Sequence, residues 1–280
     1  MPLYLLDKNV VEDIKQSLNG VPTKGAAVAR AIDLKGNIAS PLLSILEGSV
    51  QRAQSGPELY DQLMADTLAV SRFYRLAKTD SGYLRTFGAM TATAFAPHMR
   101  EKTETLAQLA MKLQALVVQQ RKLHGARDLL PKIDALANDY EVNLSHPLVT
   151  CAVACLYGSG PARGVLKPAV RPTHQGAYNA VADIRLIMET AYIRKRWNEN
   201  RIRQGVQLLS SDKNLCALSN LLQLRVELSL LTGEVGPEIV AFTATMSHKL
   251  LPNLQMQPKE MERVLNYLRT SRNTNKSILA

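Results

Sequence analysis

Two short apolar runs along the chain each lead to an aspartate at the start of a helical pattern. Leu3–Leu6 runs directly into Asp7, and Val206–Leu209 is followed, after two serines, by Asp212. A short apolar run bounded by polar residues is typical of a buried strand. We therefore predict two buried strands, each leading into a helix.

Helical spacing of apolar residues dominates the rest of the chain. One further strand is expected over residues 28–34, before the turn Gly36-Asn37, and residues 140–144 fit a short strand or an extended link. The helices that the spacing predicts cover residues 9–18, 40–50, 57–137 as a block of several, 147–157, 178–203 and 214–231, with two more after Pro237. Strands that alternate with helices imply an α/β fold with a parallel sheet.

The alternation of strands and helices is interrupted once, which predicts the domain organisation. Residues 1–56 and 145–232 carry the alternation and form the expected core. Residues 57–144 lack it, so we expect a helical insertion that protrudes from the core and binds a partner or guides the substrate. Residues 233–280 are expected to form a C-terminal helical extension.

Composition and charge narrow the setting in which the protein works. The 280 residues carry a formal net charge of +10, which favours an anionic partner, most commonly nucleic acid. The three cysteines, an odd and sparse number, indicate a reducing compartment. No leader pattern opens the chain, and its longest apolar window, residues 147–157, is too short to cross a bilayer. We predict a cytoplasmic protein with no membrane partner.

The two aspartates that follow the apolar runs are candidates for a metal site. The carboxyl ends of parallel strands meet at one edge of a sheet, where ligand sites form, so Asp7 and Asp212 can converge there. Two carboxylates in one place repel each other unless a cation lies between them, and Mg²⁺ prefers oxygen ligands. The alternative is that both aspartates simply cap helices, as aspartates often do.

Two further acids stand among apolar residues on predicted helices. Glu47 belongs to the helix expected after Ser40-Pro41, and Asp183 lies near the start of the helix expected from Tyr178. A buried carboxylate without a partner is costly, so an inward-facing acid here needs a metal ion or a base. An ordinary solvated position on the helix surface is equally open for each.

These four acidic segments together resemble the PIN-domain nucleases. Residues 5–10, Leu-Leu-Asp-Lys-Asn-Val, are similar to the opening motif of that family, L-L-D-x-N-V. Residues 40–47 are similar to its Ser-Pro element and following glutamate, and residues 179–184 to its Ala-rich helix with an aspartate. Residues 208–212 are similar to its T/S-x-D motif after a strand. The order agrees, and the resemblance covers about residues 1–55 and 145–230.

The resemblance implies a three-layer fold with a central parallel sheet and hydrolysis of phosphodiester bonds in RNA, less often DNA. A bound divalent ion, Mg²⁺ or Mn²⁺, would activate water near neutral pH. Asp212 would hold a second ion or orient water, and Asn9 and Ser211 would aim the carboxylates. The residues implied to hold one or two ions are Asp7, Glu47, Asp183 and Asp212.

The resemblance also suggests partners. In bacteria, proteins of this family are often the toxin of a toxin–antitoxin pair or an antiviral effector, which implies an inhibitory partner protein, and we expect a homo-oligomer. A cluster of cations follows Asp183 and would grip a phosphate backbone, although a solvated charged helix face is an equal alternative. The cluster comprises Arg185, Arg194, Lys195, Arg196, Arg201 and Arg203.

Two other functions stay open from the sequence. Residues 179–183, Asn-Ala-Val-Ala-Asp, resemble the H-x-A-x-x-D motif of DEDD-type exonucleases, but Tyr-Asn occupies positions 178–179 instead of a histidine. A non-catalytic helical interaction protein is the rival from another class. A test for metal-dependent cleavage separates it from either nuclease.

Overall fold

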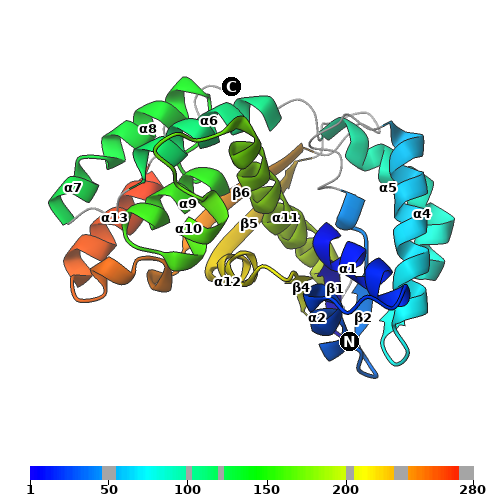
Figure 1. Ribbon diagram of the computed structural model, residues 1–280. Coiled ribbons are helices and arrows are strands. Elements are labelled where there is room, and N and C mark those ends of the chain that lie inside the picture. The colour runs from blue at the N-terminus through cyan, green and yellow to red at the C-terminus, as the bar shows by residue number, and fades with distance from the viewer. Residues whose placement is uncertain (46–54, 99–102, 119–122, 200–204, 230–238, 271–280) are drawn as a thin grey trace. The chain divides into compact units, whose positions relative to one another are not determined.

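The computed structural model forms two compact units (Figure 1). Unit 1 comprises Met1–Glu104 and Arg185–Cys216, and unit 2 comprises Thr105–Ile184 and Ala217–Ala280. These boundaries differ from those expected at 56/57 and 144/145. Among the residues described, no helix has both the length and the apolar character needed to cross a membrane. The structure describes residues 1–45, 55–98, 103–118, 123–199, 205–229 and 239–270.

A four-stranded parallel sheet organises unit 1. Its order is β3-β2-β1-β4, and every neighbouring pair is parallel. This confirms a mixed α/β fold with a parallel sheet, and it brings the carboxyl ends of all four strands to one edge. The strands are β1 (Leu3–Leu6), β2 (Ile38–Ser40), β3 (Lys78–Thr79) and β4 (Val206–Leu209).

Helices pack against this sheet through a small apolar core. Leu6 and Ala39 from the strands meet Val10 and Ile14 of α1 and Phe73 of α4, all of them buried. Leu3 and Leu5 alternate with these positions and are also buried, so apolar residues are covered on both faces of β1. The helices of unit 1 that precede residue 104 are α1 (Lys8–Leu18), α2 (Lys24–Ala31), α4 (Gly56–Phe73) and α5 (Ser81–His98).

The strand expected over residues 28–34 is wrong. Lys24–Ala31 is helix α2, because its alanines and lysine are strong helix formers and the Thr23 hydroxyl accepts a capping hydrogen bond from Ala26 N at 3.2 Å. The strand comes after the turn, at Ile38–Ser40. Ser40 therefore ends a strand rather than capping a helix. Helical structure resumes only at Ser44, and the rest of the expected helix from residue 46 to 54 lies outside the described residues.

The segment expected to be an insertion also needs correction. Residues 57–144 are largely helical, as predicted, but β3 lies inside this segment and joins the central sheet beside β2. Residues up to Glu104 belong to unit 1, and only those from Thr105 onward belong to unit 2. The whole segment is therefore not an insertion outside the sheet. A strand of two residues is too short to show a hydrophobic period.

Unit 2 is built mainly from helices around α9, whose ten residues are all buried. The helix predicted over 147–157 is thus confirmed. A short link, not a strand, occupies residues 140–144. The remaining helices are α6 (Thr103–Leu116), α7 (Leu123–Arg127), α8 (Leu130–Asp139), α9 (Pro147–Leu156), α10 (Gly160–Leu166), α13 (Pro258–Thr270), and α11 (His174–Glu199) and α12 (Lys213–Leu221), which both cross the unit boundary.

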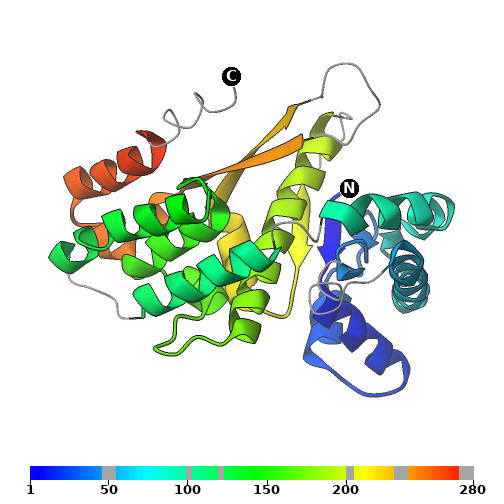
Figure 2. The ribbon, with the colours of Figure 1, turned by 90° about the horizontal axis from the view of Figure 1, so that it is seen from above.

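The helix expected over residues 214–231 ends ten residues early. It stops at Leu221, and β5 (Leu222–Ser229) pairs antiparallel with β6 (Ile239–Met246). Figure 2 shows the two as a long ribbon. Leu222 and Val226 are buried, whereas Arg225 between them is exposed, which fits the period of two residues that a strand has. Of the two helices expected after Pro237, the second is confirmed as α13, and β6 stands in place of the first.

Candidate carboxylate site

Asp7 lies at the carboxyl end of β1 and caps helix α1. Its Oδ1 accepts a hydrogen bond from Val10 N at 2.7 Å, and its own amide donates to Leu209 O of β4 at 3.1 Å. The residue is only 1% exposed. Because Leu6 pairs with Leu209 in the parallel ladder, Asp7 stands beside the first residues after β4.

Ser210 connects Asp7 to Asp212. Its hydroxyl hydrogen bonds with the Asp7 carboxylate, and its Oγ accepts a bond of 3.0 Å from Asp212 N. The Asp212 carboxylate in turn caps α12, where Oδ1 accepts from Asn214 N at 2.7 Å and from Leu215 N at 3.3 Å. The two aspartates are thus held at the same edge of the sheet, as the apolar runs predicted.

The charges at this edge act on one another. Burial raises the pKa of Asp7 above its ordinary value, and hydrogen bonds from Ser210 and Val10 oppose that rise. The negative charges of Asp13 and Asp212 raise the Asp7 pKa further. Two carboxylates that repel each other in a half-buried place favour the binding of a cation.

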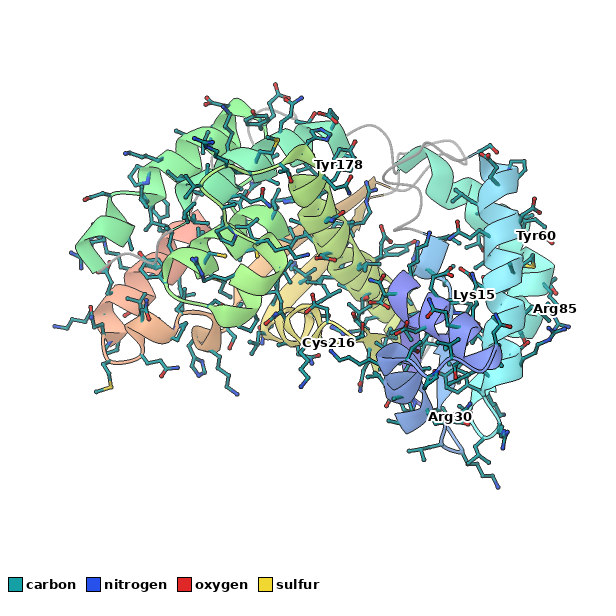
Figure 3. The ribbon with its side chains drawn as sticks, viewed as in Figure 1. Lys15, Arg30, Tyr60, Arg85, Tyr178 and Cys216 are labelled. Carbon is teal, nitrogen blue, oxygen red and sulfur yellow. The ribbon has the colours of Figure 1, made fainter. Side chains whose placement is uncertain are left out.

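Cys216 of α12 adds a sulfur to the same neighbourhood (Figure 3). Its Sγ lies 3.6 Å from Ser210 O. Burial raises the pKa of the thiol, and the charges of Asp7 and Asp212 raise it further. The thiol is therefore kept protonated, so it acts as a weak hydrogen-bond donor here and not as a nucleophile.

The capping alternative weighed from the sequence is correct for both aspartates, since each caps a helix. Capping does not exclude a second role, because an ionised carboxylate offers about four lone-pair positions on two oxygens. In both residues the hydrogen bonds from backbone amides go to Oδ1. The caps fix the direction of the carboxylates toward the edge of the sheet.

A third carboxylate on this edge escaped the sequence analysis. Asp80 directly follows β3, and Ser40 at the end of β2 hydrogen bonds with it. Burial raises the pKa of Asp80 to about 6, although the Ser40 bond opposes the rise. Its signal in the sequence is weak, because the strand before it has two residues.

Of the other two predicted acids, the structure describes only Asp183. Asp183 belongs to unit 2, where its Oδ2 lies 3.4 Å from Lys167 Nζ. An ion pair with lysine is the partner that a half-buried helix acid needs, so the setting of Asp183 is explained within its own unit. Glu47 lies outside the described residues. The roles implied for both stay predictions.

The residues expected to aim the carboxylates are placed differently. Ser210, not Ser211, makes the hydrogen bonds to the Asp7 carboxylate and the Asp212 amide. Asn9 is exposed in the first turn of α1. The two adjacent serines are equivalent in sequence, and only the strand register decides which one faces the neighbouring strand.

Parts of the predicted cationic cluster serve the fold. The Arg194 guanidinium donates from Nε and Nη2 to Val206 O at 3.1 and 2.9 Å, which ties α11 to β4. Arg185 donates to the Thr103 hydroxyl at 3.2 Å, and Arg196 lies over the Tyr192 ring. Lys195 is half-buried, and Arg201 and Arg203 lie outside the described residues. Arg194 is therefore a structural residue.

Glu189 on α11 is a second acid that the sequence did not reveal. It is half-buried, and burial raises its pKa to about 7, against the opposing charge of Arg185 one turn earlier. It has no part in the carboxylate pair, but it makes the stability of unit 1 sensitive to pH near neutrality.

A divalent ion fits the donor set at the carboxylate pair. Mg²⁺ in phosphate-transfer sites is commonly held by one or two carboxylates and keeps several waters, and Asp7 and Asp212 supply two. Within the described ranges no group of three or more histidine, cysteine, aspartate or glutamate side chains is arranged to hold a metal ion.

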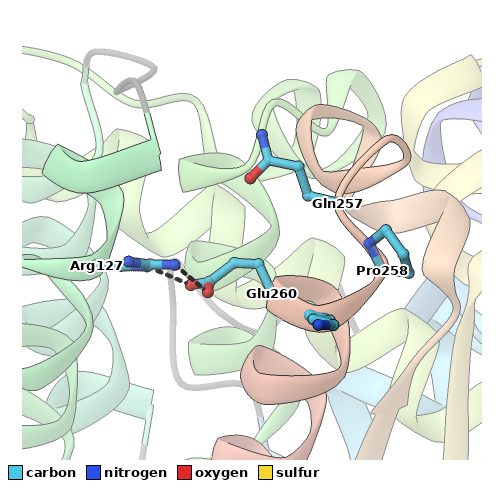
Figure 4. Close-up of a pocket in the computed structure, with 5 residues that line it drawn as sticks. Arg127, Gln257, Pro258 and Glu260 are labelled. Atoms are coloured by element: carbon cyan, nitrogen blue, oxygen red, sulfur yellow. Dashed lines mark hydrogen bonds and ion pairs between the residues drawn. The ribbon is translucent and has the colours of Figure 1, made fainter.

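A pocket on unit 2 is of a different kind (Figure 4). Arg127 and Glu260 face each other in it as an ion pair, with Arg127 Nε 2.6 Å from Glu260 Oε1. The cation is therefore already neutralised. The pocket holds no pair of acids like that of unit 1, and we assign it no role in catalysis.

Comparisons with protein-family models, curated proteins and solved structures returned no match to this chain. The function is therefore inferred from the residues of the chain itself. The residues that bear most on function are the two aspartates that cap helices at adjoining strand ends.

Proposed function

We propose that the protein is a divalent-metal-dependent nuclease of the PIN type, with a three-layer fold, that hydrolyses phosphodiester bonds in RNA. The observation that carries the proposal is the position of Asp7 and Asp212 at the ends of adjacent parallel strands, coupled through Ser210. A buried acid whose pKa is raised by burial and by a neighbouring carboxylate, as that of Asp7 is by Asp212, is typical of functional sites.

The chemistry follows from these residues. When bound, Mg²⁺ or Mn²⁺ lowers the pKa of water and neutralises charge on a phosphodiester. Asp7 and Asp212 supply oxygen ligands, and Ser210 fixes the orientation of the Asp7 carboxylate. Asp80, with a pKa of about 6, is suited to accept or release a proton near neutral pH.

The carboxylate pair also bears on the alternatives. A non-catalytic helical interaction protein would use the two acids only as helix caps, and capping does not require that they lie beside each other. A DEDD-type exonuclease would draw on Asp183, whose carboxylate forms an ion pair with Lys167. The inhibitory partner protein and the homo-oligomer remain predictions that follow from the resemblance.

The experiment is cleavage of a labelled RNA, with a labelled DNA of the same sequence beside it. Asp7→Asn and Asp212→Asn each keep the shape of the side chain but lose its charge, so we expect both to abolish cleavage. Asp61→Asn, an exposed acid on α4, is the matched control and should cleave normally. Activity should disappear with chelator and return with Mn²⁺. Cleavage that survives chelation, or persists in both variants, would refute the proposal.

A further inference from the structure

Helix α5 carries an exposed aromatic stripe that the carboxylate site does not use. Tyr83, Phe87 and Met90 recur at four- and three-residue spacing, so they share one face of the helix. They are 56%, 42% and 63% exposed. The rings of Tyr83 and Phe87 have centroids 5.0 Å apart. A row of large apolar side chains in water marks a surface that binds a partner.

The segment that contains this stripe is rich in cations, which favours an anionic partner. Between residues 68 and 98 the chain has four cations and one acid, Asp80. The cations are exposed, whereas Asp80 is half-buried. In Figure 3, Arg85 extends away from the helix into solvent. The four cations are Arg72, Arg75, Lys78 and Arg85.

The stripe begins at the edge of the sheet that holds the carboxylates. Helix α5 starts at Ser81, directly after Asp80 and β3. Strands β3, β2 and β1 are parallel, so their carboxyl ends lie at one edge of the sheet. Asp7 follows β1 at this edge, and α5, with Tyr83 in its first turn, begins at the same edge. All of these residues belong to unit 1. A chain that lies along α5 would be led toward the carboxylates.

We propose that this face of α5 binds single-stranded nucleic acid, with unpaired bases stacked on Tyr83 and Phe87 and the surrounding cations near the phosphates. The inference deepens the proposed function, on which it rests, by naming the form of the substrate. In a duplex the bases already stack on one another, so an aromatic platform selects unpaired strands. A protein partner would need a surface rich in acids to match the same cations.

Binding is measured by fluorescence anisotropy on the full chain in chelator, with a labelled oligouridine and a duplex RNA of equal length. The single strand should bind more tightly than the duplex. Tyr83→Leu/Phe87→Leu keeps the apolar bulk but removes the rings, and should weaken single-strand binding about tenfold or more. Tyr83→Phe keeps the ring and should bind as the wild type does. Tyr178→Leu, which removes an aromatic ring from unit 2, is the control expected to bind normally.

Several outcomes would overturn the assignment. Equal affinity of the double variant and the wild type would do so, as would tighter binding of duplex. If the double variant instead changes the molecular mass in solution and leaves affinity unchanged, a second copy of the chain covers this face. Stacking-dependent binding without any metal-dependent cleavage would refute only the nuclease. Metal-dependent cleavage, together with binding that is unchanged by the ring substitutions, would refute only the proposed stacking of bases on Tyr83 and Phe87.

Discussion

The hydroxyl of Ser210 hydrogen bonds with the Asp7 carboxylate, and its oxygen accepts a bond of 3.0 Å from the amide of Asp212. One small side chain therefore couples the two acids across the β1–β4 pair. The bond also lowers the pKa of Asp7 against the rise caused by burial. The orientation and the charge of Asp7 both depend on it.

Loss of that hydroxyl should weaken the carboxylate site. In Ser210→Ala the pKa of Asp7 should rise further, and Mn²⁺ affinity and cleavage should each fall about 10- to 100-fold, as for other residues that orient metal ligands. Ser211→Ala, its sequence neighbour, is the matched control and should change either quantity less than twofold. An equal loss in the two variants would show that Ser210 does not position Asp7.

Glu189 should make stability depend on pH near neutrality. Its pKa is raised to about 7, so its contribution to the free energy of unfolding is complete below the ordinary value of about 4.5 and is lost as pH rises through 7. Glu189→Gln should therefore stabilise the protein by about 1–3 kcal/mol at pH 8 and have little effect at pH 4.5. Urea unfolding at both values measures this. Glu262→Gln, an exposed acid, should show no such difference.

Asp33 should have the opposite dependence. It is buried and accepts hydrogen bonds from Arg30 and from three successive amides, and its pKa is lowered to about 2. Its contribution is present above the ordinary value of about 4 and is lost as pH falls toward 2. Asp33→Ala should cost about 1–3 kcal/mol at pH 7 because three backbone amides and the Arg30 guanidinium lose their acceptor. A cost below that of the exposed Asp61→Ala would contradict this role. The three amides are those of Arg75, Leu76 and Ala77.

Lys15 and Asp66 form an ion pair that should be costly to break from one side. Lys15 Nζ lies 2.5 Å from Asp66 Oδ1, and the Asp66 side chain is fully buried. Lys15→Met leaves that buried charge without a countercharge, with only the Ser44 hydroxyl as a hydrogen-bond donor among the described residues, and should destabilise the fold by about 3–5 kcal/mol. Lys15→Met/Asp66→Leu should recover most of the loss, and Glu12→Gln, which breaks the more exposed pair with Lys15, should cost less than about 1 kcal/mol. Additive losses in the double variant would show that the pair is not coupled.

The sequence predicted the parts of unit 1 in which local pattern and tertiary structure agree. Leu3–Leu6 and Val206–Leu209 are strands because each is a short apolar run, and their parallel pairing brings Asp7 and Asp212 together. Asp80 could not be foreseen, since the pairing of Lys78–Thr79 with β2 is a long-range contact without a local signal. The register that selects Ser210 over Ser211 is equally non-local.

Other errors came from competing local signals. Residues 222–229 alternate apolar and polar side chains, as a strand does. The leucines before them follow a helical spacing, so the sequence alone does not show that the period changes at Leu222. The apolar cluster at residues 28–34 favours a strand, but residues 28–31 belong to helix α2, whose alanines favour helix.

The most direct test of the account is Mn²⁺ binding to the full chain, measured by calorimetric titration without nucleic acid. If Asp7 and Asp212 hold one divalent ion between them, the wild type binds Mn²⁺, and Asp7→Asn and Asp212→Asn each weaken binding at least tenfold, because each removes one of two charged ligands. The exposed-acid control Asp61→Asn binds as the wild type does. Undiminished Mn²⁺ affinity in both Asp7→Asn and Asp212→Asn would contradict the central claim.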